Sequence, residues 1–274
     1  MSAGAVGILG VGAIGGSIAL RARRNGARVV GADCDAAVLE EARVLGAIDV
    51  FATAGELAGI AGVLVIAAHL EPTLREIERL ASAPASTPAL IVDVASVKLP
   101  VVRAAKGLTN FVATHPMAGT QRSGVCAARA DLFDGRTWAY VPSGDEKLDR
   151  RARRFIESMG AVPFAISAED HDRAVALSSH LPQLVAACYA KLLRANEDSV
   201  ERLCGPVARE LLRISGMSFA MWRDIFDANA ANVEPQLRAL IVELEAAADA
   251  LAGCDVDSLS PLFGTAGHPS TGSG

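Results

Sequence analysis

The chain has 274 residues, enough for one large domain or two modest domains that each bury a core. Hydrophobic residues make up 51% and aromatic residues 4%, which predicts a core of Ala, Val, Leu and Ile. A net charge of −5 argues against nucleic acid or an anionic membrane as a partner, and no apolar stretch is long enough to span a bilayer. The five cysteines form no C-x-x-C pair, so we expect reduced thiols in a cytoplasmic protein and no metal site.

The first predicted element is a short apolar strand over residues 6–9, and a glycine-rich turn follows it. The pattern G-x-G-x-x-G and the residues beside it supply the candidate cofactor-binding residues Gly10, Gly12, Ala13, Ile14 and Gly15. In this pattern the first glycine permits a tight turn, the second lets the backbone approach a pyrophosphate, and the third lets the helix pack on the strand. The helix predicted over residues 13–25 would direct its N-terminus at that anion. The motif therefore predicts a dinucleotide-binding site.

A second apolar strand, over residues 28–32, leads directly into Asp33. A carboxylate at this distance from the glycine loop is expected to bind the ribose hydroxyls of a dinucleotide. Its negative charge, with Asp35 beside it, would repel a 2′-phosphate, so we expect NAD and not NADP. The alternative is that Asp33 caps the helix predicted over residues 36–45.

Strands and helices continue to alternate up to about residue 166, which is typical of a parallel sheet wrapped by helices. Further strands are predicted at 62–68, 89–94 and 111–114, with 138–141 and 162–166 extending the same sheet, and helices at 72–83, 98–107 and 146–159. From Ser167 only helical periodicity remains, at 170–195, 199–215, 219–231 and 233–252. The chain is therefore predicted to be α/β, with an N-terminal Rossmann domain (1–167), an all-helical domain (168–257) and a flexible tail (258–274). We expect a homodimer through the helical domain.

Ligands of open α/β sheets bind beyond the carboxyl ends of the strands, and this rule selects further candidate residues. His69 follows the strand 62–68, where a cofactor contact or a role like that of a helix N-cap is expected. Ser96 follows the strand 89–94, at the nicotinamide end of the cofactor, where we expect it to contact the cofactor and to hydrogen-bond a substrate hydroxyl. The alternative for Ser96 and Lys98 is a helix N-cap with a solvent-facing lysine.

His115 is the most informative residue of the chain, because it follows a predicted strand and is fixed by Pro116. Imidazole is the side chain best suited to take a proton near neutral pH. Such a base complements a nicotinamide that removes a hydride from an alcohol carbon. We therefore predict an oxidoreductase in which His115 takes the hydroxyl proton and Ser96 orients it. The alternative is a histidine that satisfies a backbone group in a turn.

Five segments together resemble the prephenate and arogenate dehydrogenases of tyrosine biosynthesis, in that family's order, between Val6 and about Ala252. They are the glycine loop, DVASVK (93–98), HPMAGT (115–120), SHLP (179–182) and MWRDI (221–225). The resemblance implies a Rossmann domain followed by a helical dimerisation domain. It also implies NAD-dependent oxidative decarboxylation of prephenate to 4-hydroxyphenylpyruvate, or of arogenate to tyrosine. By the same resemblance Arg213 binds a substrate carboxylate; the alternative is a surface residue of a helix. Ser179 and His180 begin the first long helix of the second domain, near the substrate, and the alternative for His180 is a structural role.

The chain departs from that family at two positions expected to contact the substrate. Gln121 stands where many members carry an acid, and Gln183 stands where many carry a second histidine. Both bear on which substrate is preferred, and a dual-specificity enzyme is one outcome. A β-hydroxyacid dehydrogenase or imine reductase is the main alternative, but those enzymes usually need a lysine in the second domain, where only Lys191 is available. A non-catalytic NAD-binding sensor is a further alternative, against which the presence of His115 and Ser96 argues.

Overall fold

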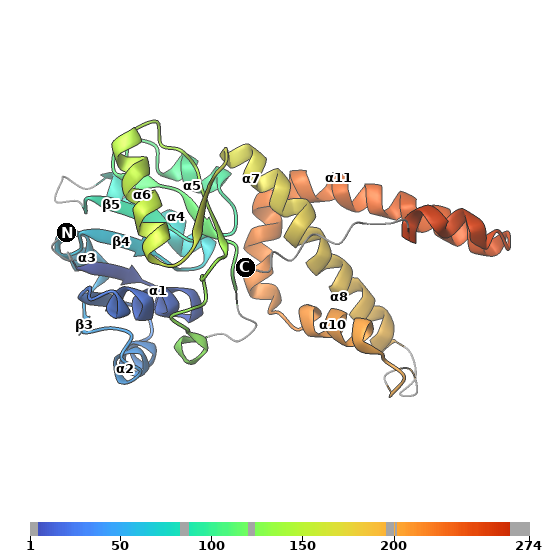
Figure 1. Cartoon of the computed structure of the whole chain (residues 1–274), viewed down its shortest axis with the longest axis horizontal. Helices are drawn as coiled ribbons and strands as arrows, with labels where there is room; N and C mark the ends of the chain where they lie inside the picture. The colour runs from blue at the N-terminus through green and yellow to red at the C-terminus, as the bar shows by residue number, and fades with distance from the viewer. Residues whose placement is uncertain (1–4, 83–87, 120–123, 196–199, 201, 264–274) are drawn as a thin grey trace.

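The computed structural model describes residues 5–82, 88–119, 124–195, 200 and 202–263. Figure 1 shows two parts, an N-terminal domain built around a sheet and a C-terminal part made of helices. The last strand of the first part ends at Ala165, and the first helix of the second part begins at Ala168. The predicted fold class, a Rossmann-like α/β domain followed by an all-helical part, is confirmed.

A six-stranded sheet forms the N-terminal part, with strand order β3-β2-β1-β4-β5-β6. The strands are β1 (Val6–Leu9), β2 (Val29–Ala32), β3 (Val50–Phe51), β4 (Val63–Ile66), β5 (Leu90–Asp93) and β6 (Phe111–Val112). Every neighbouring pair is parallel, as the alternation of apolar strands and helices predicted. The order reverses direction at β1, so the glycine loop that follows β1 lies at the point where ligands of such sheets bind.

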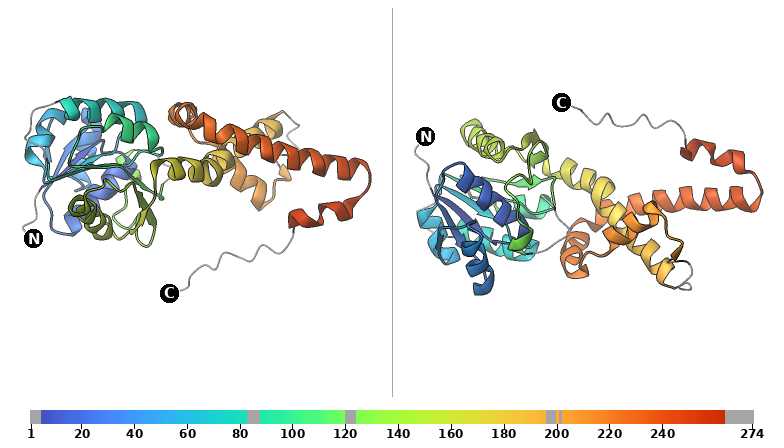
Figure 2. Two further views of the ribbon diagram at one scale, coloured as in Figure 1. Left: turned by 90° about the horizontal axis from the view of Figure 1, so that it is seen from above. Right: turned by 60° about the horizontal axis from the view of Figure 1, so that its bottom comes forward.

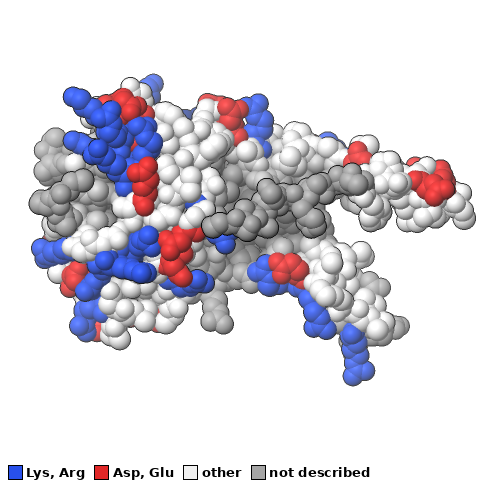
Figure 3. Space-filling model, in the orientation of Figure 1, with Lys and Arg blue, Asp and Glu red and all other residues white. Residues whose placement is uncertain are grey.

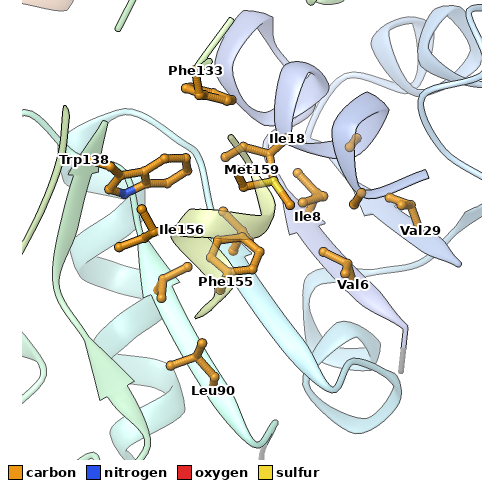
Figure 4. Packing of buried hydrophobic residues seen from close by; sticks show 14 of the residues in the cluster. Val6, Ile8, Ile18, Val29, Leu90, Phe133, Trp138, Phe155, Ile156 and Met159 are labelled. Carbon is orange, nitrogen blue, oxygen red and sulfur yellow. The ribbon is translucent and has the colours of Figure 1, made fainter. Parts of the chain in front are cut away.

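Helices cover both faces of this sheet, and each face has its own hydrophobic core (Figures 1 and 2). The helices are α1 (Ala13–Arg24), α2 (Ala36–Val44), α3 (Ala54–Ile60), α4 (Leu70–Ser82), α5 (Leu99–Ala104) and α6 (Glu146–Ser158). Successive strand residues alternate between the two cores, so that Val65 packs with α1 and α6 while Leu64 packs with α3 and α4. The first core contains large aromatic rings, with the centroids of Phe133 and Trp138 4.9 Å apart (Figure 4).

The prediction that residues 138–141 and 162–166 extend the main sheet is wrong. Instead β7 (Thr114–Pro116), β8 (Thr137–Tyr140) and β9 (Val162–Ala165) form a separate three-stranded sheet in which β7 is antiparallel to β8. The chain leaves the main sheet at Thr114. The Thr114 backbone N–H donates to Asp93 Oδ1 at 2.8 Å, and the Trp138 indole N–H donates to Thr114 Oγ1 at 2.9 Å. These contacts turn the strand away from β5.

The helical part begins with an interrupted helix that leads the chain away from the sheet. It consists of α7 (Ala168–Val175), one turn of π-helix, η2 (Ala176–His180), and α8 (Leu181–Arg194), where one helix over 170–195 was predicted. A short 3₁₀ turn, η1 (Val125–Ala127), lies earlier, against α1. Helix α10 (Pro206–Ser215) then packs against α8.

The two helices predicted over 219–231 and 233–252 are joined into one, α11 (Phe219–Ala252). This helix bends at Asn229, whose backbone angles are not helical (φ −119°, ψ 15°). Its first half contacts α4 and α7, and its second half extends away from the rest of the chain (Figure 2). The 3₁₀ turns of η3 (Val256–Phe263) include the first residues of the segment from 258 that was predicted to be a flexible tail. Among the described helices, none has the length and apolar character required to cross a membrane.

A buried ion pair lies at the carboxyl end of β5. The Lys98 side chain is fully buried, pairs with Asp93 Oδ2, and donates to the Thr114 carbonyl at 2.6 Å. The prediction of a solvent-facing lysine is therefore wrong: its backbone does begin α5, but its ammonium is drawn inward by a buried carboxylate and a carbonyl. Burial lowers the pKa of Lys98, and the charge of Asp93 opposes that shift.

Replacing Lys98 with methionine keeps the length of the side chain but leaves the Asp93 carboxylate buried without its cation. We expect the free energy of unfolding to fall by roughly 3–5 kcal/mol, because an uncompensated buried charge is costly. Urea denaturation followed by circular dichroism measures this loss. The control is Lys106→Met, at an exposed lysine of the same domain, which should change stability by less than about 0.5 kcal/mol. Equal losses in the two variants would contradict a structural role for the pair.

Candidate active site

The glycine loop after β1 has the geometry of a phosphate-binding turn. Gly10 has φ +88°, and a Cβ there would lie 2.5 Å from the Ala67 carbonyl oxygen, so only glycine fits. A Cβ on Gly15 would lie 1.9 Å from the Gly10 carbonyl oxygen, which shows how closely α1 approaches β1. A Cβ on Gly12 would meet nothing within 4 Å. Gly10 and Gly15 are thus required by the fold, whereas the space beside Gly12 is open to a ligand.

The N-terminus of α1 suits an anion. Its N-cap is Gly12, no side chain caps it within the described residues, and its first turn, which includes Ala13 and Ile14, contains no acidic residue. The unpaired N–H groups and the positive end of the helix dipole are therefore available to a pyrophosphate.

Asp33 lies at the carboxyl end of β2, beside the glycine loop. Its Oδ2 accepts from the Val11 backbone N–H at 2.8 Å, and its Oδ1 accepts from the Asp35 backbone N–H at 3.0 Å. The helix cap is Asp35, whose Oδ1 accepts from Ala37 N–H at 2.8 Å, so the alternative in which Asp33 caps α2 is wrong. Asp33 is instead fixed as a carboxylate at the edge of the loop, a position that suits a ribose diol and disfavours a 2′-phosphate.

His115 lies in β7, in the segment by which the chain leaves the main sheet. Its Nδ1 is 2.9 Å from Nε2 of His171, a residue of α7, and the two rings meet edge to face. Nδ1 of His171 in turn is 2.8 Å from Asp172 Oδ1. The imidazole predicted to be the base is therefore the end of a three-residue chain that joins the sheet domain to the helical part.

The surroundings of His115 keep its ring neutral. Burial lowers its pKa well below the usual value of 6.5, and the ammonium of Lys98 and the nearby rings of His171 and His180 lower it further. Burial also lowers the pKa of His180 to about 4, with Asp172 opposing and His171 adding to the shift. A ring that is neutral at physiological pH has a free lone pair, which a general base requires.

Two predicted residues lie at the same edge of the sheet as His115. Ser96 is half-buried in the loop between β5 and α5, and its hydroxyl makes no hydrogen bond to the described residues, so it is available to a ligand. His69 follows β4 and is exposed, and its carbonyl accepts from the Thr73 backbone N–H at 3.0 Å at the start of α4. Gln121 lies outside the described residues.

The remaining predicted residues come from the helical part. His180 is buried at the end of η2, and its Nδ1 accepts from Asn229 Nδ2 at 3.1 Å, while Ser179 beside it is half-buried. The Gln183 side chain donates to the Ile214 carbonyl at 3.0 Å. This contact joins the start of α8 to the end of α10.

Arg213, next to Ile214 on α10, is exposed and forms a two-point ion pair with Glu210 one turn earlier. Gln183 of α8 therefore contacts α10 at Ile214, the residue that follows Arg213. The structure records no contact between Arg213 and His115. Lys191, which the β-hydroxyacid alternative would need as a proton donor, is exposed on α8.

Sequence reasoning missed His171 and Asp172. Both are buried, at 2% and 0% exposure, although they belong to a strongly charged segment that begins α7. The available signal was the helix cap at Ser167, which places residues 168, 171, 172 and 175 on one face of the helix. Ala168 and Val175 on that face are apolar, so the two polar residues between them had to be buried with partners. In the described part of the chain no cluster of three or more His, Cys, Asp or Glu residues could hold a metal ion.

Comparison with known proteins agrees with this geometry. The nucleotide-binding domain of prephenate dehydrogenase matches residues 18–164, and the dimerization domain of prephenate dehydrogenase matches residues 167–265. The chain is 34% identical over 253 residues to the probable prephenate dehydrogenase NovF of Streptomyces niveus, covering 90% of this chain and 68% of the relative. It is 32% identical over 274 residues to prephenate dehydrogenase of Bacillus subtilis, covering 94% and 73%.

A solved structure extends the likeness to three dimensions. The prephenate dehydrogenase of Aquifex aeolicus, in complex with hydroxyphenyl propionate and NAD⁺, superimposes with a TM-score of 0.86 at 26% identity, covering 96% of this chain and 97% of that one. The match includes both the sheet domain and the helical part. Both domains of this family match in order along the chain, and two relatives, 34% and 32% identical, are covered over at least two thirds of their length, so the chain belongs to the prephenate dehydrogenase family.

Proposed function

We propose that this chain is an NAD-dependent dehydrogenase that oxidatively decarboxylates prephenate to 4-hydroxyphenylpyruvate, arogenate to tyrosine, or both. The observation that carries the proposal is the imidazole of His115, held by His171 at the edge of the sheet that also carries the glycine loop. The relatives and neighbours support both substrates, since they include a cyclohexadienyl dehydrogenase of Zymomonas mobilis, 29% identical over 73% of this chain and 67% of the relative.

The substrate is a cyclohexadienol with a ring carboxylate opposite its hydroxyl. NAD bound on the glycine loop supplies the hydride acceptor. His115 would take the hydroxyl proton while the carbon that bears the hydroxyl gives up its hydride, so that the C–O bond gains carbonyl character. The bond between the ring and its carboxylate then breaks and carbon dioxide leaves. The electron pair of the broken bond stays in the ring and makes it aromatic. His115 would return the proton to the resulting phenolate oxygen, so the imidazole ends as it began.

The other predicted residues would hold the substrate in place for this step. Ser96 would donate to the oxygen that becomes a carbonyl, and Arg213 would bind a substrate carboxylate with its planar guanidinium. Gln183, Gln121, Ser179 and His180 would border the substrate side chain. With glutamines at positions 121 and 183, this border carries no formal charge from either residue, and we infer that the enzyme accepts prephenate and arogenate alike.

We infer that the chain is organised as a nucleotide-binding domain (1–167) and a substrate and dimerisation domain (168–257), and that it forms a homodimer through the second. In α11 none of the residues 234–252 is buried, although Val242, Leu244 and Leu251 are apolar and about 60% exposed. Figure 3 shows mostly uncharged surface over α8 and α11, whereas Lys and Arg gather near α6. A second copy of this helical part would cover such a surface. The five free cysteines support a cytoplasmic enzyme.

The reaction is tested by following NADH at 340 nm with prephenate and, separately, with arogenate, using NAD and then NADP. We expect turnover with NAD and little with NADP, because Asp33 would repel the 2′-phosphate. His115→Asn should lower kcat by about 10²–10⁴-fold, the contribution of a general base, while the Kd for NAD stays unchanged. Absence of NADH with both substrates would overturn the proposal, and full activity of His115→Asn would overturn the role of the imidazole.

The role of the glycine loop is tested by Gly12→Ala. The added methyl group meets no protein atom, so the melting temperature should stay close to that of the wild type. The same methyl group would occupy the space of the pyrophosphate, and we expect the Kd for NAD to rise about tenfold or more, which corresponds to 1.4 kcal/mol. Isothermal titration calorimetry measures it.

The matched control for this experiment is Gly59→Ala, in α3, where a Cβ likewise meets nothing. This variant should bind NAD as the wild type does. If Gly12→Ala also kept wild-type affinity, the loop would not contact the cofactor as proposed.

The dimer is tested by sedimentation velocity on variants of α11. Val242→Lys and Leu251→Lys place charges on the apolar surface, and together they should shift the protein from dimer to monomer at micromolar concentration. The control is Val44→Lys on α2, a still more exposed valine of the other domain, which should leave the dimer intact. A dimer that resists both α11 substitutions would place the interface elsewhere.

A further inference from the structure

We propose that His171 and Asp172 are positioning residues of the catalytic base, which fix the tautomer of His115 and share the positive charge that His115 gains when it takes a proton. The inference rests on the proposed role of His115 and extends it to two residues of the helical part. It gives the contact between the sheet domain and the helical part a direct role in the reaction.

The tautomers follow from the order of the three groups. Asp172 is a carboxylate, so His171 Nδ1, 2.8 Å from it, must carry a proton and donate. A neutral His171 then has its lone pair on Nε2. His115 Nδ1, 2.9 Å from that nitrogen, must therefore carry a proton and donate in its turn. The one free lone pair of His115 is left on Nε2, the nitrogen that would face the substrate hydroxyl. The opposite tautomer would set two acceptors against each other in a buried site.

Asp172 is held in place by several hydrogen bonds, so it can fix the position of His171 and, through it, of His115. Its carboxylate accepts from the backbone N–H groups of Lys98 and Leu99 at 2.7 and 2.9 Å, at the start of α5. Its backbone carbonyl accepts from Asn229 Nδ2 at 2.8 Å, in the bend of α11. Burial raises the pKa of Asp172, but the hydrogen bonds from His171, Leu99 and Lys98 outweigh it and hold the pKa below its usual value. One residue thus attaches α7 to the sheet domain and to α11 while it orients His171.

The charges around His115 explain why such a partner is needed. The ammonium of Lys98 and the ring of His180 both oppose a positive charge on His115, as does burial. The Asp93 carboxylate is already paired with Lys98. Asp172 is the remaining buried carboxylate in contact with this group of residues among those described, and it reaches His115 only through His171. A proton taken by Nε2 of His115 leaves a cation whose Nδ1–H points at His171 and, beyond it, at a negative charge.

The experiment compares two substitutions of His171. His171→Leu fills the space without an acceptor, and kcat should fall about a hundredfold while the Kd for NAD changes little. His171→Gln offers an oxygen near the place of Nε2, and it should recover at least about tenfold of that loss. Wild-type kcat in His171→Leu would overturn the proposal.

A second readout separates positioning from a general structural role. If His171 acts through His115, then the double variant His115→Asn, His171→Leu should be within about twofold of His115→Asn alone, because residues that act as a unit are not additive. A merely structural residue would lower kcat again by the full factor of the single variant, and that result would overturn the proposal.

A third readout does not depend on turnover. Nitrogen-15 NMR of the imidazoles, with His115 assigned from His115→Asn, reports which ring nitrogen carries the proton. We expect the Nδ1–H form of His115 in the wild type and a shift toward the Nε2–H form in His171→Leu. If His115 of the wild type carried its proton on Nε2, the positioning role of His171 and Asp172 would be overturned, even if the enzyme oxidised neither substrate. If His115 carried its proton on Nδ1 but neither substrate were oxidised, the proposed substrate would be overturned and the positioning role would stay supported.

Discussion

The buried contact of Asp93 with Lys98 and Thr114 is the constraint on which the site depends. Asp93 ends β5, and its carboxylate binds the Thr114 N–H one strand away, while Lys98 donates to the Thr114 carbonyl. These bonds end the main sheet at β6 and start the second sheet at β7. Because His115 is the next residue, the direction of its side chain is set by a charge pair that never reaches solvent.

The same loop also forms the joint between the two parts of the chain. Lys98 gives its side chain to Asp93, within the sheet domain, and its backbone N–H to Asp172, in α7. A movement of α7 against α5 would therefore change the partner of His171 and, through it, the ring of His115. The base is correctly oriented only while the helical part is docked, so the site is completed by packing between domains and is not carried by the sheet alone.

Local patterns in the sequence predicted those features of the structure that are determined by short stretches of chain. The glycine loop and the order of strands and helices follow from residue spacing, and the place of His115 at the sheet edge follows from the rule that ligands bind beyond the carboxyl ends of parallel strands. The burial of Lys98 could not be predicted in this way. A lysine near a helix start is usually solvated, and only the three-dimensional meeting of β5, β7 and α5 provides the two acceptors that draw it inward. The second sheet was missed for the same reason, since its break at Thr114 is caused by a residue 21 positions earlier.

The two kinds of ion pair in this protein suit two different tasks. The pair of Asp93 and Lys98 is buried and cannot exchange partners, so it fixes the backbone. The pair of Arg213 and Glu210 is exposed, where water and salt weaken the attraction. A substrate carboxylate could therefore replace Glu210 at little cost and gain the same two-point contact. In the proposed mechanism, rigid charges orient the base and the exchangeable charge of Arg213 receives the anion, so a site with a neutral histidine at its centre selects a substrate that carries two carboxylates.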